Sequence, residues 1–364
     1  MATLRAIHGG RRGEQVAVLL NANAKSVNDR MRREITRFVP EEDVFFSRTL
    51  DDARAITREV LARGYTTLLT GGGDGTFVGY VNEVLSQCMT TGPVVARGGA
   101  VLKLEPRPVP PPKFGVLHLG TGNSIAGMTG ASPRPVGVVE DILRARAGDV
   151  RQTHQIHLID VDGKLAPFTG VGVDARIIND YVTVSRKFRG TPFSAFGSGG
   201  PGYLLAIAGR SIPAVLLERK PANVLITNEG EPAQQLAPDG RPVGRPIEKG
   251  EILFQGPLRL VAAGTVPNYG FGFKIFPHAR KAEGRMHLRL SALTVPQMVR
   301  HMGAIWKGRT PRTGILDFLT QKVRLEFDRP MPLQVGGDAE GFREAVTFAV
   351  DSRPVELLDF KATA

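Results

Sequence analysis

The most informative part of the sequence is Leu68-Leu69-Thr70-Gly71-Gly72-Gly73-Asp74-Gly75-Thr76, in which a short apolar run enters a turn made of glycines. The run before the turn has the β-prone residues of a buried strand, and residues 77–88 have the composition of a helix. Glycines between a strand and a helix let backbone N–H groups approach a phosphate closely, since no Cβ stands in the way. A carboxylate in such a loop would repel bare phosphate, so Asp74 indicates a metal–nucleotide complex.

A second glycine turn repeats this plan. Val116-Leu117-His118-Leu119 has the pattern of a buried strand, Gly120-Thr121-Gly122-Asn123-Ser124 follows it, and residues 125–128 begin a helical pattern. Two such units in one domain predict a sheet whose carboxyl ends line a shared crevice, where ligands of open α/β sheets bind. A lone glycine cluster would fit a ligand-free tight turn equally well; two clusters, one with an acid, favour a phosphate site.

The two turns together resemble the catalytic domain of diacylglycerol kinases and their bacterial lipid-kinase relatives, which include sphingosine and ceramide kinases. The glycine motifs are the specific part of this resemblance, and shorter stretches extend it along most of the chain. These shorter stretches are Val16–Asn21, Ser47 with Ala53, Val171–Ala175, Lys274–Ala279 and Gly337-Asp338-Ala339-Glu340.

The chain also departs from the family pattern. Ser124 stands where Asp is commoner, Gly79 stands where Glu is usual, and Ala22 replaces a proline after Asn21. Residues 282–284, Ala-Glu-Gly, replace an Asp-Asp-Gly that helps to hold a structural magnesium ion in relatives. A second metal site at this loop is therefore left open. Ala339 replaces the glycine of a late Asp-Gly-Glu motif, which leaves the roles of the two acids beside it open.

The resemblance implies an N-terminal α/β domain with a parallel sheet, of the kind shared by diacylglycerol kinases and NAD kinases, and a C-terminal antiparallel β-sandwich domain. It implies an ATP- and Mg²⁺-dependent kinase that phosphorylates the hydroxyl of a lipid alcohol such as diacylglycerol or a sphingoid lipid. We expect Asp74 to hold the metal and thereby to act in catalysis. The residues expected to bind the nucleotide are Asn21, Ser47, Gly72, Gly73, Gly75, Thr76, Gly120, Thr121, Gly122 and Asn123.

The acceptor hydroxyl has a pKa far above neutral, so a carboxylate beside it would help by accepting its proton. Asp338 is the expected base because it follows Gly336-Gly337 at a bend and matches the family's acidic position, and Glu340 is the second choice. Without the resemblance, a polar turn between two strands would be the better interpretation of both acids.

Length and composition fit two domains, expected at residues 14–148 and 149–351, with 352–364 packing back on the first.

The net charge is +12 and the pI about 10.1, and a protein with such a charge attracts polyanions. The resemblance favours an anionic membrane surface, and no nucleic-acid-binding motif is visible. A single cysteine, Cys88, fits a reducing compartment, and neither a signal peptide nor a membrane-spanning run is evident. We expect a cytoplasmic protein at the membrane periphery, and a homodimer is left open.

Local patterns predict several elements. Thr49 with Asp52 predicts a capped helix start and Gly64 a helix stop. Asp162-Gly163 predicts a hairpin, and alternation in residues 286–291, 323–327 and 346–350 predicts antiparallel strands. The proline-rich residues 97–113 and the polar residues 234–250 are expected to be loops. In residues 186–203, basic and aromatic side chains would either touch a membrane or cover the core.

Two other functions remain open on the sequence alone. NAD kinases share the first glycine loop on a related architecture, although the second loop and the Asp338 segment favour a lipid kinase. A membrane-associated nucleotide-binding protein without catalytic activity is the other alternative, because the sequence departs from the family at Ala339 and at residues 282–284.

Overall fold

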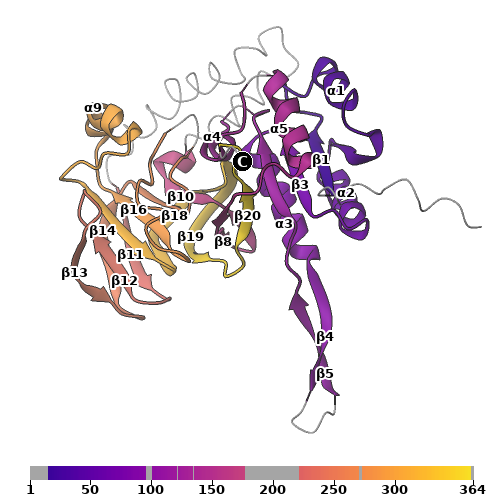
Figure 1. The fold of residues 1–364 in the computed structure, drawn as a ribbon. Coiled ribbons are helices and arrows are strands. Elements are labelled where there is room, and N and C mark those ends of the chain that lie inside the picture. Colours follow the sequence, from indigo (N-terminus) through magenta and orange to yellow (C-terminus); the bar gives the residue numbers. More distant parts are fainter. Residues whose placement is uncertain are drawn as a thin grey trace, which may run out of the picture. The chain divides into compact units, whose positions relative to one another are not determined.

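The computed structural model describes residues 15–95, 101–120, 122–133, 135–176, 221–269 and 273–361 (Figure 1). The chain divides into two compact units, one made of residues 1–155 with 355–364 and the other of residues 156–354. Thr121 and the basic, aromatic segment 186–203 lie outside the described residues. No helix in the described ranges combines the length and the hydrophobicity needed to cross a bilayer.

The first unit contains a six-stranded sheet in the order β2-β1-β3-β6-β20-β7. Each of β2, β3, β6 and β20 pairs in parallel with its neighbour on the path from β2 to β20. The central strands are apolar runs buried on both faces, as parallel strands covered by helices require. The α/β class of the N-terminal domain is therefore confirmed. The strands are β1 (Val16–Asn21), β2 (Val44–Ser47), β3 (Thr67–Gly71), β6 (Lys113–Leu117), β7 (Thr153–Ile156) and β20 (Val355–Leu358).

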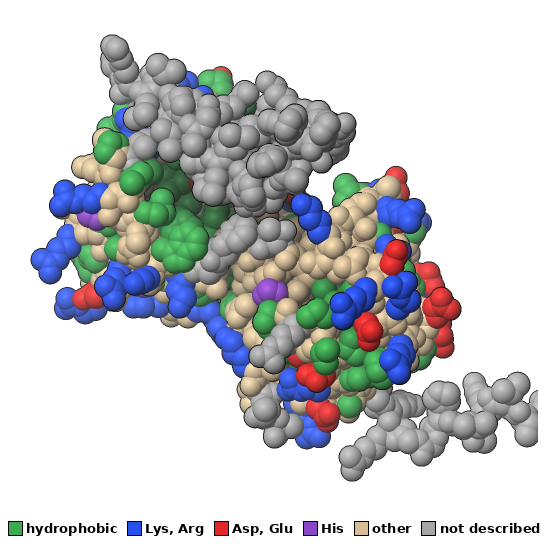
Figure 2. All heavy atoms as spheres, turned by 90° about the horizontal axis from the view of Figure 1, so that it is seen from above, with side chains coloured by type: hydrophobic (Ala, Val, Ile, Leu, Met, Phe, Trp, Pro, Cys, Tyr) green, Lys and Arg blue, Asp and Glu red, His purple; other side chains and the backbone are tan. Residues whose placement is uncertain are grey.

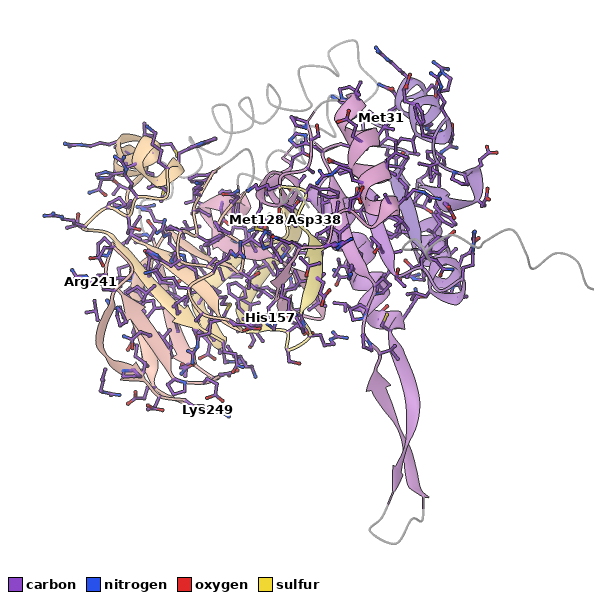
Figure 3. All side chains as sticks on the ribbon, in the orientation of Figure 1. Met31, Met128, His157, Arg241, Lys249 and Asp338 are labelled. Carbon is purple, nitrogen blue, oxygen red and sulfur yellow. The ribbon has the colours of Figure 1, made fainter. Side chains whose placement is uncertain are left out.

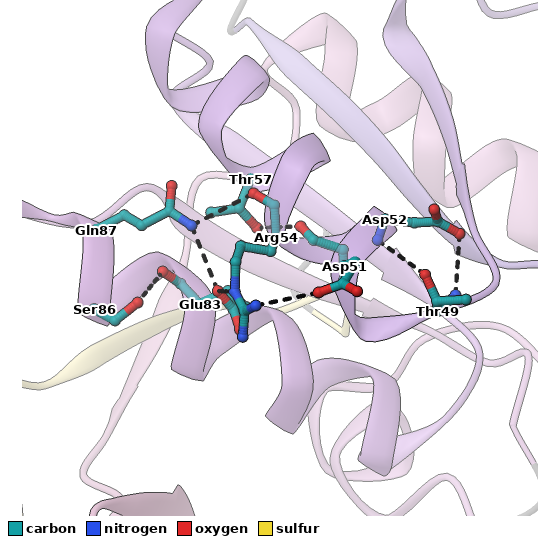
Figure 4. A network of polar contacts seen from close by, with 9 residues as sticks. Thr49, Asp51, Asp52, Arg54, Thr57, Glu83, Ser86 and Gln87 are labelled. Carbon is teal, nitrogen blue, oxygen red and sulfur yellow. Dashed lines mark hydrogen bonds and ion pairs between the residues drawn. The ribbon is translucent and has the colours of Figure 1, made fainter.

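The helix after β2 begins and ends where the local chemistry predicts. The hydroxyl of Thr49 accepts the N–H of Asp52 at 3.1 Å and the Asp52 carboxylate accepts the N–H of Thr49 at 3.0 Å, so the capping box is confirmed. Arg54 then joins this helix to Glu83 of the next one (Figure 4). The helices are α1 (Asp29–Thr36), the 3-10 turn η1 (Glu41–Asp43), α2 (Leu50–Ala62), α3 (Asp74–Gln87), α4 (Ser124–Thr129) and α5 (Pro135–Ala147).

The prediction of a loop over residues 97–113 is wrong for much of this segment. Met89–Val95 (β4) and Val101–Pro108 (β5) form an antiparallel two-stranded ribbon, which Figure 1 shows projecting from the end of α3. Pro106 pairs with Thr91 within this ribbon. A two-stranded ribbon has only edges, so a strand with prolines can keep its ladder on one side.

The second unit contains a twelve-stranded sheet in which every pairing is antiparallel, in agreement with the predicted class of the C-terminal domain. The expected hairpin turn is present, with Asp162 and Gly163 at φ 53° and 85°. Its strands are β8 (Ile159–Val161), β9 (Lys164–Ala166), β10 (Phe168–Gly172), β11 (Ala222–Asn228), β12 (Ala233–Leu236), β13 (Pro242–Ile247), β14 (Ile252–Leu258), β15 (Leu260–Gly264), β16 (Met286–Ser291), β17 (Ile315–Thr320), β18 (Lys322–Val335) and β19 (Asp338–Val350), and α9 (Val295–Trp306) lies between β16 and β17 in the chain.

The prediction of a loop over residues 234–250 is also wrong. Strands β12 and β13 pair across a turn at Asp239-Gly240, and β13 is the exposed edge of the sheet. An edge strand tolerates the prolines and glycine that made this stretch look like a loop, because one side of it needs no ladder partner. Figure 3 shows Arg241 and Lys249 extending from this part of the sheet.

A charged group lies inside the second unit, on the polar side of β16. Arg289 donates to both carboxylate oxygens of Asp317 at 2.8 and 2.9 Å, and the Nε2 atom of His287 lies 3.0 Å from the same carboxylate. All three side chains are almost fully buried. The ring of His278 lies 5.1 Å from that of His287, centroid to centroid. Burial of both faces of β16 explains why its polar residues pair with each other instead of with water.

His278 is expected to make the free energy of unfolding depend on pH. Burial, together with the neighbouring His287, lowers the pKa of His278 from 6.5 to about 4. Between these values the unfolded chain binds more protons than the folded chain, so stability is lost as the pH falls from 6.5 towards 4. Urea denaturation between pH 7 and 4.5 should show this loss, and His278→Gln should make it smaller. An equal loss in the variant would contradict the assignment.

Candidate active site

The two glycine turns lie against each other at the carboxyl edge of the parallel sheet. Strands β3 and β6 are parallel neighbours, with Gly71 opposite Leu117, so the turns that follow them leave the sheet side by side. A Cβ on Gly120 would lie 2.2 Å from the Cα of Gly73, which shows how closely the two backbones approach. The first turn leads into α3 and the second into α4. The two turns that were expected to line a shared crevice therefore lie side by side.

The first turn has a backbone that only glycine adopts readily. Gly72 and Gly73 have φ of 153° and 106°, and a Cβ on Gly72 would lie 2.4 Å from the hydroxyl of Thr76. Gly73 caps α3 without any side-chain hydrogen bond to the helix, while a Cβ on Gly75 would meet no atom within 4 Å. An uncapped helix N-terminus with open space beside its first turn is suited to bind an anion.

The carboxylate of Asp74 joins the two turns. One oxygen accepts the N–H of Ser124 at 2.9 Å and the other accepts the N–H of Ile125 at 3.1 Å. Asp74 therefore caps the N-terminus of α4, a role that the sequence did not indicate. These two bonds fix the carboxylate between the two turns, next to Gly122, whose Cβ would lie 3.2 Å from it.

The residues around Asp74 fit one magnesium ion shared with a nucleotide. Mg²⁺ in nucleotide sites is commonly held by one or two carboxylates together with phosphates and water. Asp74 supplies one carboxylate, and the hydroxyl of Ser124 is buried without a hydrogen-bond partner among the described residues. The described part of the chain, which includes residues 282–284, contains no group of three or more His, Cys, Asp and Glu side chains that could hold a metal by themselves.

Two predicted binding residues lie at the ends of strands β1 and β2. Asn21, at the end of β1, donates to the hydroxyl of Thr76 at 3.1 Å and accepts the N–H of Asn23 at 2.9 Å. Ser47, at the end of β2, is buried beside Tyr80, whose pKa is raised by burial. Thr76 thus binds Asn21 and does not cap α3. Both strand ends lie along the same edge of the sheet as the glycine turns.

The predicted residues of the second turn shape its backbone. Asn123 has a left-handed backbone with φ 47°. Its side chain accepts the N–H of Gly120 at 2.8 Å and donates to the Gly120 carbonyl at 2.6 Å. Both ends of the amide are therefore used within the turn. Thr121 lies between them in the sequence, outside the described residues.

Gly120→Ala is expected to lower the free energy of unfolding by about 1–3 kcal/mol, because the added methyl group would collide with the backbone of Gly73. Gly127→Ala is the matched control: this residue lies in α4, where a Cβ meets no atom within 4 Å and alanine suits a helix better than glycine. Denaturant titrations of both variants check the expectation. Equal stability of the two variants would show that the turns are not packed as described.

The two predicted acids of the second unit share one lysine. Asp338 and Glu340 begin β19 after a turn at Gly336-Gly337, where both glycines have positive φ, and Figure 3 marks Asp338 there. Lys164 of β9 donates to Asp338 at 3.0 Å and to Glu340 at 2.6 Å. The Asp338 side chain is 63% exposed and that of Glu340 31%. Burial alone would lower the pKa of Lys164, but the two carboxylates outweigh it and raise that pKa.

A buried polar group supports the turn before Asp338. The hydroxyl of Tyr269 donates to Asp174 at 2.6 Å, and the amide nitrogen of Gln334 lies near both of them. The amide oxygen of Gln334 accepts the N–H of Gly337 at 2.9 Å. Burial raises the pKa of Asp174 despite these bonds. Tyr269 and Gln334 were not expected from the sequence. Gln334 is brought here by the antiparallel pairing of β18 with β10.

Comparisons with known proteins agree with this geometry. The chain matches the family model of the diacylglycerol kinase catalytic domain, and no curated protein matches it. A diacylglycerol kinase from Bacillus anthracis str. Sterne has 12% identity over 98% of this chain and 100% of its own, with a TM-score of 0.58. A proposed diacylglycerol kinase from the same organism has 14% identity over 98% and 99%, with a TM-score of 0.61. At such identities the likeness shows a shared fold. The match covers residues 15–154, which span both glycine turns, and it agrees with the resemblance found in the sequence.

Proposed function

We propose that this protein is an ATP- and Mg²⁺-dependent kinase that transfers a phosphoryl group to the hydroxyl of a lipid alcohol. The observation that carries the proposal is the contact between the two glycine turns, with Asp74 fixed between them. The match of residues 15–154 to the family model supports a kinase, and the lipid acceptor is inferred from the resemblance to lipid kinases.

In this proposal the first unit binds and neutralises the triphosphate. The backbone N–H groups of Gly72, Gly73 and Gly75 would contact phosphate oxygens, because no side chain blocks them. Asp74 would hold Mg²⁺, which supplies charge neutralisation during phosphoryl transfer. Residues 120–123 would form the opposite wall. Asn21 and Ser47 would complete the nucleotide side.

The second unit would supply the base. The oxygen of the acceptor hydroxyl attacks the γ-phosphorus, the bond from that phosphorus to the β–γ bridging oxygen breaks, and ADP leaves. The hydroxyl proton passes to Asp338, or to Glu340 as the second choice. Lys164 holds both carboxylates together, and the Gln334 bond to Gly337 fixes the turn that presents them. The side chain of Asp338 is the more exposed of the two, which favours it as the group that meets a substrate.

We also propose that the protein works at an anionic membrane surface. The net charge of +12 would draw it to anionic lipids, since each basic residue near such a surface adds roughly 1 kcal/mol of attraction. Figure 2 shows Lys and Arg side chains on the visible face, together with hydrophobic groups gathered in a hollow.

The proposal is tested by incubating the protein with γ-labelled ATP, Mg²⁺ and a panel of lipid alcohols, followed by chromatography of the products. The panel contains diacylglycerol, a sphingoid base, ceramide and, as the competing acceptor, NAD. A labelled lipid is the expected result. Labelled NADP in place of a labelled lipid would show an NAD kinase. No labelled product with any acceptor would favour a nucleotide-binding protein without catalysis.

A further inference from the structure

Helix α9 of the second unit exposes a row of large apolar side chains. Val299, Met302 and Trp306 are 63%, 42% and 43% exposed, and their spacing of three and four residues places them in one line along the helix. We call these three residues the apolar stripe. Among the α9 side chains that the structure describes, only Ile305 is buried. A helix normally turns such a stripe towards the core, so its exposure indicates an interaction surface.

The helix is held firmly in this position. At its start the side chain of Gln297 accepts the N–H of Thr294 at 2.9 Å, and at its end the carbonyl of Trp306 accepts the N–H of Lys274 at 3.1 Å. The ring of Trp306 also stacks on that of Phe273, with 5.2 Å between the centroids. Figure 1 shows α9 above the strands of the second unit. The apolar stripe is therefore presented by an ordered helix.

Basic side chains lie beside the apolar stripe. Arg300 belongs to α9 and Lys307 is its C-cap. The N–H of Arg309 donates to the carbonyl of Ala304 at 2.9 Å, which keeps Arg309 next to the end of the helix. These three basic residues, which we call the basic rim, are exposed, and none of them forms an ion pair within the part of the chain that the structure describes. Residues 295–314 contain four Lys and Arg but no Asp or Glu.

The combination of stripe and rim fits an anionic lipid bilayer. Helices that lie in the membrane interface pair an apolar face that often carries Trp with flanking Lys and Arg, and Trp favours the headgroup level. A second copy of this chain fits less well, because a two-fold contact would place the basic rim opposite itself. A nucleic acid would attract the rim but would gain little from the aliphatic side chains of Val299 and Met302.

We propose that α9 docks on an anionic bilayer, with the apolar stripe between the lipid headgroups and the basic rim against their phosphates. A helix of 12 residues is too short to cross the bilayer and would lie along it. The inference rests on the proposed membrane association, for which it supplies a surface, and it does not depend on phosphoryl transfer.

Trp306 is the one tryptophan of the chain, so its fluorescence reports on the stripe directly. The protein, without ATP, is titrated with phosphatidylcholine vesicles that either contain or lack phosphatidylglycerol. The emission should shift to shorter wavelength only with the anionic vesicles, and lipids with brominated acyl chains should then quench it. Vesicles that bind the protein, as measured by co-sedimentation, without changing the emission of Trp306 would overturn the proposal.

Variants separate the stripe from the rim. The double variant Val299→Gln/Met302→Gln should weaken binding to anionic vesicles by at least about tenfold, and Arg300→Gln by about threefold to fivefold. Val136→Gln/Leu143→Gln and Arg58→Gln are the matched controls, since they change exposed residues of the same kinds on helices of the first unit. Each control should change binding less than about twofold.

Equal losses in the α9 variants and their controls would overturn the site, because general charge attraction would then account for binding. A blue shift that grows with protein concentration in the absence of lipid would instead show a second copy on α9, and an equal shift with duplex DNA would show a nucleic-acid surface. Transfer to a short-chain, water-soluble diacylglycerol should be unchanged in the double variant. Failure of docking and failure of the proposed reaction therefore give different results.

Discussion

Asp74→Asn is expected to lower the rate of phosphoryl transfer by at least about 10²-fold, because it removes the one carboxylate proposed to hold Mg²⁺ at the triphosphate. Asparagine keeps a carbonyl oxygen that can still accept one N–H from α4, so the fold should survive. The loss of the second bond should cost about 1 kcal/mol of stability, as for other helix caps. Initial rates with labelled ATP at saturating lipid measure the first effect, and a urea titration measures the second.

Asp51→Asn is the matched control for this change. Asp51 is an acid of the same unit with a side chain that is 90% exposed, and it lies in the first turn of α2. Its replacement removes the same charge and should leave the transfer rate unchanged. If the Asp74 variant were as active as wild type, the assignment of the first glycine turn to the phosphates would be wrong.

Asp338→Asn is expected to reduce turnover by about 10²–10⁴-fold, the range found when a positioned general base is lost. The affinity for ATP should not change, because the proposed nucleotide contacts belong to the first unit. The two effects are separated by measuring turnover at saturating lipid and, independently, ATP binding by calorimetry. Exposure of the Asp338 side chain makes a large loss of stability unexpected.

Two further variants make this result specific. Glu340→Gln tests the other acid on Lys164, and a larger loss there than in the Asp338 variant would move the base to Glu340. Glu344→Gln replaces an exposed acid on the same strand and should be without effect. Full activity in both the Asp338 and the Glu340 variants would place the base elsewhere.

Much of the first unit could be predicted because local signals decide it. The glycine turns, the Thr49–Asp52 capping box and the buried strands each depend on a few neighbouring residues. The contact between the turns followed from one topological rule, since neighbouring parallel strands end at the same edge of a sheet. The hydrogen bonds that the side chains make could not be predicted in this way. Nothing in the sequence around Asp74 shows that its carboxylate accepts two N–H groups of a helix fifty residues later.

The second unit was harder to predict, because distant strands supply its contacts. Lys164 meets Glu340 across 176 residues of chain, and Gln334 meets Asp174 across 160. Such pairs depend on antiparallel register, which a single sequence does not reveal. Proline is misleading for a related reason: proline-rich stretches predict loops, whereas β5 and β13 carry proline on strands with an edge that needs no partner.

Amide hydrogen exchange with and without Mg·ATP shows whether both glycine turns bind one magnesium-bound triphosphate. We expect slower exchange in residues 71–76 and in residues 120–125 together, with little change at the exposed β12–β13 edge. Protection of only one turn, or of neither turn while ATP is shown to bind, would contradict it.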